Sequence, residues 1–226
     1  MILYAIPTPL GGAAADALPP SAIKTVRSLK DFAVENAKSA RAFLGALGMA
    51  VRELSIVEIQ EKDFSLIKPL REGRSMGLLS EAGCPAIADP GAALIEAAHR
   101  EGFRVVPLVG PSAIVMALMA SGLEGQRFAF CGYLPRDAVS RKKEIQKLER
   151  RSRLERETEI FIETPYRNDA MLQSLLEACS AGTRLCVAAD LTLPTETIAS
   201  RTIEQWRRSP APPGKRPTVF LLLAST

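Results

Sequence analysis

Histidine is almost missing from this chain, and cysteine is scarce and scattered. The 226 residues include a single histidine, His99, and four cysteines that never form a Cys-x-x-Cys pair. Structural and catalytic zinc sites use clustered cysteine and histidine, and serine or cysteine triads need a histidine base. We therefore expect no metal site and no triad, unless His99 alone serves as a base. Its place beside Arg100 on a predicted helix favours a solvated side chain.

Long apolar runs are missing as well. The longest candidate, residues 108–122, is broken by Gly110 and Pro111, whereas a membrane-spanning helix needs about 20 apolar residues. The first residues also lack the basic start of a secretory signal. With 47% hydrophobic and 24% charged residues, the composition is that of a globular protein. We expect no membrane anchor and a cytoplasmic location.

What the chain does contain is a regular alternation of patterns typical of strands and helices. In the first half, we expect strands at 3–6, 31–35, 75–80 and 104–108, and helices at 21–29, 37–47 and 92–101. Such alternation predicts a parallel sheet with right-handed crossovers.

The segment Gly110-Pro111-Ser112 interrupts this alternation, and Ser112 suits the N-cap of an apolar helix at 113–121. We therefore predict an α/β fold with two mixed α/β domains, over residues 1–110 and 111–226. In the second, we expect strands at 128–133, 159–163, 184–191 and 218–223, and helices within 135–157 and at 169–180 and 202–208.

The positive charge is concentrated in residues 135–157, which hold nine Lys/Arg against five Asp/Glu, an excess equal to the net charge of +4. The stretch predicts a helix with an apolar stripe at Ile145, Leu148 and Leu154. Its basic face could lie along a phosphate backbone, with Arg141, Lys142 and Lys143 as contacts. A solvated helix with i,i+4 ion pairs explains the same charges equally well, so both interpretations stand.

The loops after the strands are the expected ligand-binding edge of an open α/β sheet. The loop at 80–91 contains two glycines and two prolines, which fix its shape and let its backbone approach a ligand closely. Residues 107–113 form a second such turn before a helix. Neither has the glycine spacing of a dinucleotide-binding motif or a P-loop.

Several stretches carry a family resemblance when taken together and in this order: Ile6-Pro-Thr-Pro-Leu-Gly11, Leu79-Ser-Glu-Ala-Gly-Cys-Pro-Ala-Ile-Ala-Asp-Pro-Gly91, Val106-Pro-Leu-Val-Gly-Pro-Ser112, Gly132-Tyr-Leu-Pro135, Phe161-Ile-Glu-Thr-Pro-Tyr-Arg167 and Asp190-Leu-Thr192. The chain resembles the tetrapyrrole (corrin/porphyrin) methylase superfamily of S-adenosylmethionine-dependent methyltransferases. Within it, the chain is most similar to the branch that methylates a ribose of small-subunit ribosomal RNA, as a short and divergent member.

This resemblance implies the class III methyltransferase architecture, in which two α/β domains form a homodimeric enzyme with the cofactor cleft between the domains. It also implies S-adenosylmethionine as the cofactor. Carried over by position, the expected cofactor contacts are Pro9, Gly83, Cys84, Ile87, Ser112, Ala113, Glu163, Thr192 and Thr218. Cys84 is expected to contribute its backbone rather than its thiol.

The departures from the family pattern fall in loops expected to handle the substrate. Where the RNA branch typically has Ala-Glu-Asp-Thr-Arg-His-Thr, this chain reads Val34-Glu-Asn-Ala-Lys-Ser-Ala40. Glu-Ser-Pro-His-Arg becomes Glu163-Thr-Pro-Tyr-Arg167, again without histidine. The cofactor motifs are intact, whereas the substrate loops have changed.

Methyl transfer from a sulfonium requires an in-line approach of the acceptor, and positioning can supply much of the rate without a metal. If the acceptor is a ribose hydroxyl, a carboxylate can take its proton. Glu81 is the first candidate and Glu35 the second, although a loop-fixing role accounts for either acid. Arg167 is expected to hold a substrate phosphate or to pair with a carboxylate across the domains.

Three functions follow. The leading one is methylation of RNA, in particular the ribose 2'-hydroxyl of ribosomal RNA. The second is methylation of a small molecule such as a tetrapyrrole. The third is a protein that binds S-adenosylmethionine without catalysis, because the loops that usually handle substrate are the ones that differ.

Overall fold

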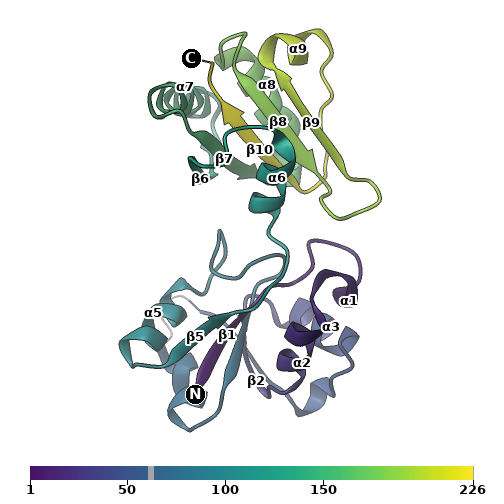
Figure 1. Ribbon diagram of the computed structural model, residues 1–226, viewed down its shortest axis with the longest axis vertical. Helices are drawn as coiled ribbons and strands as arrows, with labels where there is room; N and C mark the ends of the chain where they lie inside the picture. The colour runs from purple at the N-terminus through teal and green to yellow at the C-terminus, as the bar shows by residue number, and fades with distance from the viewer. Residues whose placement is uncertain (61–63, 226) are drawn as a thin grey trace. The chain divides into compact units, whose positions relative to one another are not determined.

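The computed structural model describes residues 1–60 and 64–225, and the chain divides into two compact units (Figure 1). The first unit is Met1–Ser112, and the second begins at Ala113. The boundary expected between residues 110 and 111 lies just before this division. In the part of the chain that the structure describes, no helix is both long and apolar enough to cross a membrane.

The first unit is built on a parallel sheet, as the sequence predicts. Its strand order is β3-β2-β4-β1-β5, and every neighbouring pair is parallel. The strands are β1 (Ile2–Ile6), β2 (Asp31–Val34), β3 (Ser55–Glu58), β4 (Met76–Leu79) and β5 (Arg104–Pro107). All their carboxyl ends therefore meet at one edge. The sequence pattern does not predict β3, a short edge strand that is largely exposed.

Helices cover both faces of this sheet (Figure 1). On one face lie α1 (Ala14–Ala17), α2 (Pro20–Arg27) and α3 (Ala37–Ala46), packed against Phe32 and Leu79. On the other lie η2 (Phe64–Ile67), α4 (Lys68–Arg71) and α5 (Ala92–Arg100), packed against Met76 and Leu78. A short 3₁₀ turn, η1 (Val51–Glu53), precedes β3. In an α/β sheet with helices on both faces, ligands typically bind at the loops beyond the carboxyl ends of the strands.

One helix start in this unit bears directly on the site. The side-chain oxygen of Asn36 accepts hydrogen bonds from the N–H groups of Lys38 (2.9 Å) and Ser39 (3.1 Å). With Asn36 as its N-cap, α3 begins at Ala37, so only Glu35 and Asn36 separate it from the end of β2. Glu35 is thereby fixed at the carboxyl edge of the sheet.

The second unit has a mixed sheet of order β6-β7-β10-β8-β9. The strands are β6 (Phe128–Tyr133), β7 (Thr158–Glu163), β8 (Arg184–Ala189), β9 (Thr197–Thr202) and β10 (Thr218–Leu223). Only β6 and β7 are parallel, whereas β10 runs antiparallel to β7 and β8. The start of β10 therefore meets the carboxyl ends of β7 and β8.

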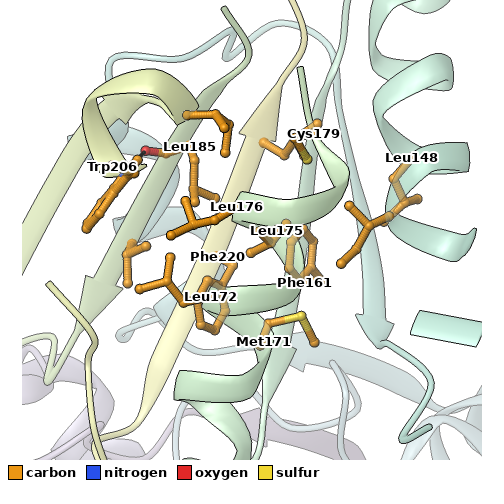
Figure 2. Close-up of a cluster of buried hydrophobic side chains, with 14 of the residues drawn as sticks. Leu148, Phe161, Met171, Leu172, Leu175, Leu176, Cys179, Leu185, Trp206 and Phe220 are labelled. Carbon is orange, nitrogen blue, oxygen red and sulfur yellow. Dashed lines mark hydrogen bonds between the residues drawn. The ribbon is translucent and has the colours of Figure 1, made fainter. Parts of the chain in front are cut away.

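Helices α7 (Ala138–Glu155), α8 (Asn168–Ala178) and α9 (Ile203–Arg208) pack on the core of this unit, and α6 (Ala113–Ser121) contacts β8, β9 and β10. Figure 2 shows Phe161 and Phe220 among the leucines of α8. Their rings are stacked, with centroids 5.8 Å apart. The buried Trp206 donates its indole N–H to the carbonyl of Leu185 at 2.9 Å. This core holds the carboxyl ends of β7 and β8 in fixed positions.

Candidate functional site

The loops after β1 and β4 are joined by a pair of backbone hydrogen bonds. The N–H of Thr8 donates to the carbonyl of Gly83 at 2.9 Å, and the N–H of Gly83 donates to the carbonyl of Thr8 at 3.0 Å. The Thr8 hydroxyl also donates to the carbonyl of Ser80 at 3.3 Å, and both of these side chains are buried. Pro9 and Gly83, two expected cofactor contacts, are thereby held next to each other.

The loop after β5 joins the same cluster through small residues and close contacts. A Cβ on Gly110 would lie 2.5 Å from Cβ of Pro7, so only glycine allows this approach. The Cys84 thiol donates to the carbonyl of Pro111 at 3.4 Å. Burial raises the pKa of this thiol, which keeps it protonated and supports a structural role for Cys84. The structure thus groups the expected contacts Pro9, Gly83 and Cys84 at one edge, with Ser112 next in the chain after Pro111.

The loop between β4 and α5 adopts a strained backbone. Ala86 has φ 65° and Ala88 has φ 66°, in the left-handed region that residues with a Cβ rarely occupy. Between them, Ile87 is 48% exposed. Backbone strain of this kind clusters at functional sites. Ile87 is one of the expected cofactor contacts, and its exposure leaves its side chain open to a ligand.

Three carboxylates lie near this loop, with distinct surroundings. Glu35 accepts a hydrogen bond from the backbone N–H of Glu81 at 2.9 Å, so its carboxylate fixes the loop. The side chain of Glu81 is exposed. The pKa of Asp89 is raised to about 6, first by burial and then by the negative charges of Glu35 and Glu81, against a hydrogen bond with Ser80. Sequence reasoning did not single out Asp89, because its burial depends on how the loop folds.

In the second unit, the expected residues meet where β7 and β8 end and β10 begins. Thr218 is the strand partner of Glu163 on one side and of Ala189 on the other. Glu163 is buried and accepts hydrogen bonds from the N–H of Thr164 (2.6 Å) and from the Arg167 guanidinium. Within this unit, the carboxylate partner of Arg167 is Glu163, four residues earlier at the end of β7.

The loop after β8 is also strained. Asp190 has φ 54° and Thr192 has φ 74°, which is a marked outlier for a β-branched residue. The conformation is held by hydrogen bonds from the Thr192 N–H to Glu196 (2.9 Å) and from the Thr195 hydroxyl to Asp190 (2.9 Å). Thr192 therefore lies on a loop held by hydrogen bonds, at the same edge of the sheet as Glu163.

The basic helix is real, but its faces differ from the expected ones. Arg141 is buried, with Nε donating to the hydroxyl of Ser174 and Nη1 to the carbonyl of Arg136, each at 2.9 Å. Its assignment to an exposed basic face is therefore wrong. Leu154 is 73% exposed because it lies nine residues after Ile145, about two and a half turns along the helix.

The exposed face of α7 is nevertheless basic. Lys142 and Lys143 are exposed as expected, as is Arg150. Of the helix acids, Glu149 is buried and accepts hydrogen bonds from the Ser180 N–H and the Thr183 hydroxyl. Instead of the expected i,i+4 ion pairs along α7, Glu149 faces inward and Glu144 pairs with Lys147, three residues later. Because Arg141 is buried as well as Glu149, the excess of cations over acids in residues 135–157 is unchanged when both are left out.

Outside these loops, His99 is exposed as expected. Among the residues that the structure describes, no three Asp, Glu, His or Cys side chains are placed to hold a metal ion.

Comparisons with known proteins agree with this fold. The family model "Tetrapyrrole (Corrin/Porphyrin) Methylases" matches residues 5–206. "Ribosomal RNA small subunit methyltransferase I" of Vibrio cholerae is 34% identical over 199 residues, which cover 87% of this chain and 67% of the relative. The protein of that name from Bacillus subtilis is 32% identical over 206 residues, or 90% and 68% of the two chains.

Solved structures show the same architecture. The methyltransferase CobJ superposes with a TM-score of 0.63 at 20% identity, covering 99% of this chain and 94% of that one. Diphthine synthase superposes with a TM-score of 0.66 at 17% identity, covering 100% of this chain and 90% of that one. The sequence match and the fold together place the chain in one family: it is a member of the tetrapyrrole methylases, methyltransferases that use S-adenosylmethionine.

Proposed function

We propose that this methyltransferase modifies a ribose 2'-hydroxyl of small-subunit ribosomal RNA in the cytoplasm. The observation that carries the proposal is the exposed basic face of α7, with Lys142, Lys143 and Arg150, in a chain whose relatives are named as methyltransferases of small-subunit ribosomal RNA. A surface of this kind binds the phosphate backbone without regard to sequence. Buried Arg141 and Glu149 contribute instead to the core beneath it.

The carboxyl edge of the first unit fits S-adenosylmethionine. The closely packed glycine and proline turns at Pro9, Gly83 and Gly110 allow a ligand to approach the backbone. Glu35, Glu81 and Asp89 would give this edge a negative potential that favours the positive sulfonium and ammonium groups of the cofactor. The cofactor supplies an electrophilic methyl group when bound. The remaining expected contacts, Ala113, Glu163, Thr192 and Thr218, belong to the second unit.

The acceptor hydroxyl must lose its proton as the new O–CH₃ bond forms and the sulfur–methyl bond breaks. We assign the proton to Asp89 rather than to Glu81 or Glu35. Glu35 already fixes the loop, and Glu81 extends into solvent. A carboxylate whose pKa is about 6 is ionised at neutral pH and is a stronger base than an ordinary aspartate. The products are a ribose methyl ether, S-adenosylhomocysteine and a proton.

We also propose that the protein acts as a homodimer that buries the exposed side of α6. Val115 and Met119 lie one turn apart on this helix and are 48% and 79% exposed. Apolar side chains grouped in this way favour contact with another protein surface. Met119→Glu should shift the mass measured by sedimentation from dimer to monomer. A wild-type protein that sediments as a monomer at micromolar concentration would contradict the proposal.

The substrate is tested with labelled S-adenosylmethionine and a fractionated extract of cells that lack this protein. Label recovered in RNA supports the proposal. Label in small molecules would replace it with a tetrapyrrole-like substrate. Cofactor binding with no labelled product would point to a non-catalytic protein.

A further inference from the structure

An unusually exposed aromatic ring lies beside the expected cofactor residues of the second unit. Tyr166 belongs to the 3₁₀ turn η3 (Pro165–Arg167), directly after β7. It is 81% exposed, more than any other large apolar side chain in the described part of the chain. In the sequence, Tyr166 stands where the RNA branch typically has histidine.

The backbone beneath this ring is held firmly. Glu163 and Asn168, on either side of the turn, have buried side chains. The Arg167 guanidinium binds Glu163, and the Arg167 N–H donates to the carbonyl of Thr164 at 2.9 Å. Pro165 restricts the backbone further. Tyr166 therefore presents its ring to solvent from a rigid base, so little conformational entropy is lost when a ligand contacts it.

A lysine from a distant segment lies over the ring. Nζ of Lys215 is 5.5 Å from the ring centroid of Tyr166. Its loop is fixed by Asn168, whose Nδ2 donates to the carbonyls of Gly214 (3.0 Å) and Arg216 (2.7 Å). The Pro-rich segment at residues 209–217 is thus tied to the start of α8.

The charge of this lysine is not neutralised by a neighbouring acid. Arg216 lies 3.7 Å from Asp190, and Arg167 binds Glu163. Lys215, by contrast, has no carboxylate within salt-bridge distance among the residues that the structure describes. The cation covers one face of the Tyr166 ring and leaves the ring free to accept a second partner on the other.

We infer that Tyr166 and Lys215 form a binding platform for one unpaired nucleotide of the RNA substrate. The base stacks on the open face of Tyr166, and the adjoining phosphate contacts Lys215. Proteins recognise single-stranded RNA by stacking unpaired bases on exposed aromatic rings beside cations. This inference rests on the proposed function and adds that the RNA is unpaired where it meets the second unit.

The test compares binding of a labelled single-stranded RNA and of the same sequence in a duplex, by fluorescence anisotropy with the full-length protein. Tyr166→Ala should weaken binding to the single strand about tenfold or more and leave duplex binding within about twofold. Tyr166→Phe keeps the ring and should bind like the wild type. Phe128→Ala removes another exposed aromatic ring of the same unit, at the opposite edge of the sheet, and is the matched control. Lys215→Gln should reduce the salt dependence by about one phosphate contact.

The outcomes distinguish a failure of the proposed function from a failure of the binding platform alone. A wild type that binds neither RNA would overturn the proposed function, and the platform with it. A wild type that binds RNA while Tyr166→Ala binds equally well would overturn the platform alone. Equal losses for Tyr166→Ala and Phe128→Ala would also overturn it, since the effect would not be specific to this ring.

Discussion

Thr8 and Gly83 exchange backbone hydrogen bonds of 2.9 and 3.0 Å, which join loops that are far apart in the sequence. The pair works because Gly83 adopts φ +77°, a conformation that costs a residue with a side chain about 1 kcal/mol or more. The loops after β1 and β4 consequently form one surface at the carboxyl edge of the sheet. The proposed cofactor site depends on that surface.

Gly83→Ala should therefore weaken cofactor binding as well as stability. The added Cβ would lie 3.2 Å from Leu10 and would strain the backbone. Gly73→Ala is the matched control, because Gly73 has φ +84° and no atom within 4 Å of the added Cβ. Both variants should lose about 1 kcal/mol of unfolding free energy, but only Gly83→Ala should lower the affinity for S-adenosylmethionine in calorimetry. Equal affinities would contradict the assigned role.

Asp89 should make stability depend on pH in a defined direction. Its folded pKa of about 6 exceeds the ordinary value of 3.8, so its ionisation opposes folding. The penalty is absent below pH 3.8, develops between pH 3.8 and 6, and is complete above pH 6. Asp89→Asn should be more stable than the wild type above pH 6, and the difference should vanish as the pH falls toward 4. Denaturation across this range measures it, with exposed Asp16→Asn as the control.

The same group should govern activity. We expect the wild-type methylation rate to rise as the pH passes through about 6 and Asp89→Asn to lose most activity while it keeps cofactor affinity. Glu35→Gln removes a negative charge near Asp89 but keeps a carbonyl oxygen for the Glu81 N–H. Its rate profile should therefore move to lower pH. A profile unchanged in Glu35→Gln would show that another group accepts the proton.

The buried and the exposed cations of α7 should respond differently to substitution. Arg141→Ala removes buried hydrogen bonds to Ser174 and to the Arg136 carbonyl, and should cost about 1–3 kcal/mol of stability. Lys142→Gln with Lys143→Gln should change stability by less than about 0.5 kcal/mol. The double variant should instead reduce the salt dependence of RNA binding, by a slope of about 1.4 for a single strand. A salt dependence lowered by Arg141→Ala but not by the lysine pair would contradict this division.

Some strands of the fold can be predicted from the sequence, and others cannot. Apolar periodicity and turn residues locate β1, β6 and β10 within a residue or less. β3 and β9 escape because they are edge strands whose side chains are largely polar or exposed.

The candidate site is likewise only partly predictable from the sequence. The order of the motifs along the sequence predicts which loops meet at the carboxyl edge. The order of the strands in the sheet brings those loops together, and their backbones then form hydrogen bonds. Burial of Arg141 and Glu149, however, depends on the angle at which α7 packs on α8. The raised pKa of Asp89 depends on a folded loop and two neighbouring acids. No count of charges along the chain contains that information.

The most direct test of the account is methylation of purified small ribosomal subunits from cells that lack this protein, with labelled S-adenosylmethionine. The RNA is then hydrolysed in alkali, which leaves a dinucleotide intact only where the ribose 2'-hydroxyl is methylated. We predict that the label is recovered in one alkali-resistant dinucleotide and that Asp89→Asn abolishes it. Label on a base, on a ribosomal protein or on a small molecule alone would contradict the proposed reaction.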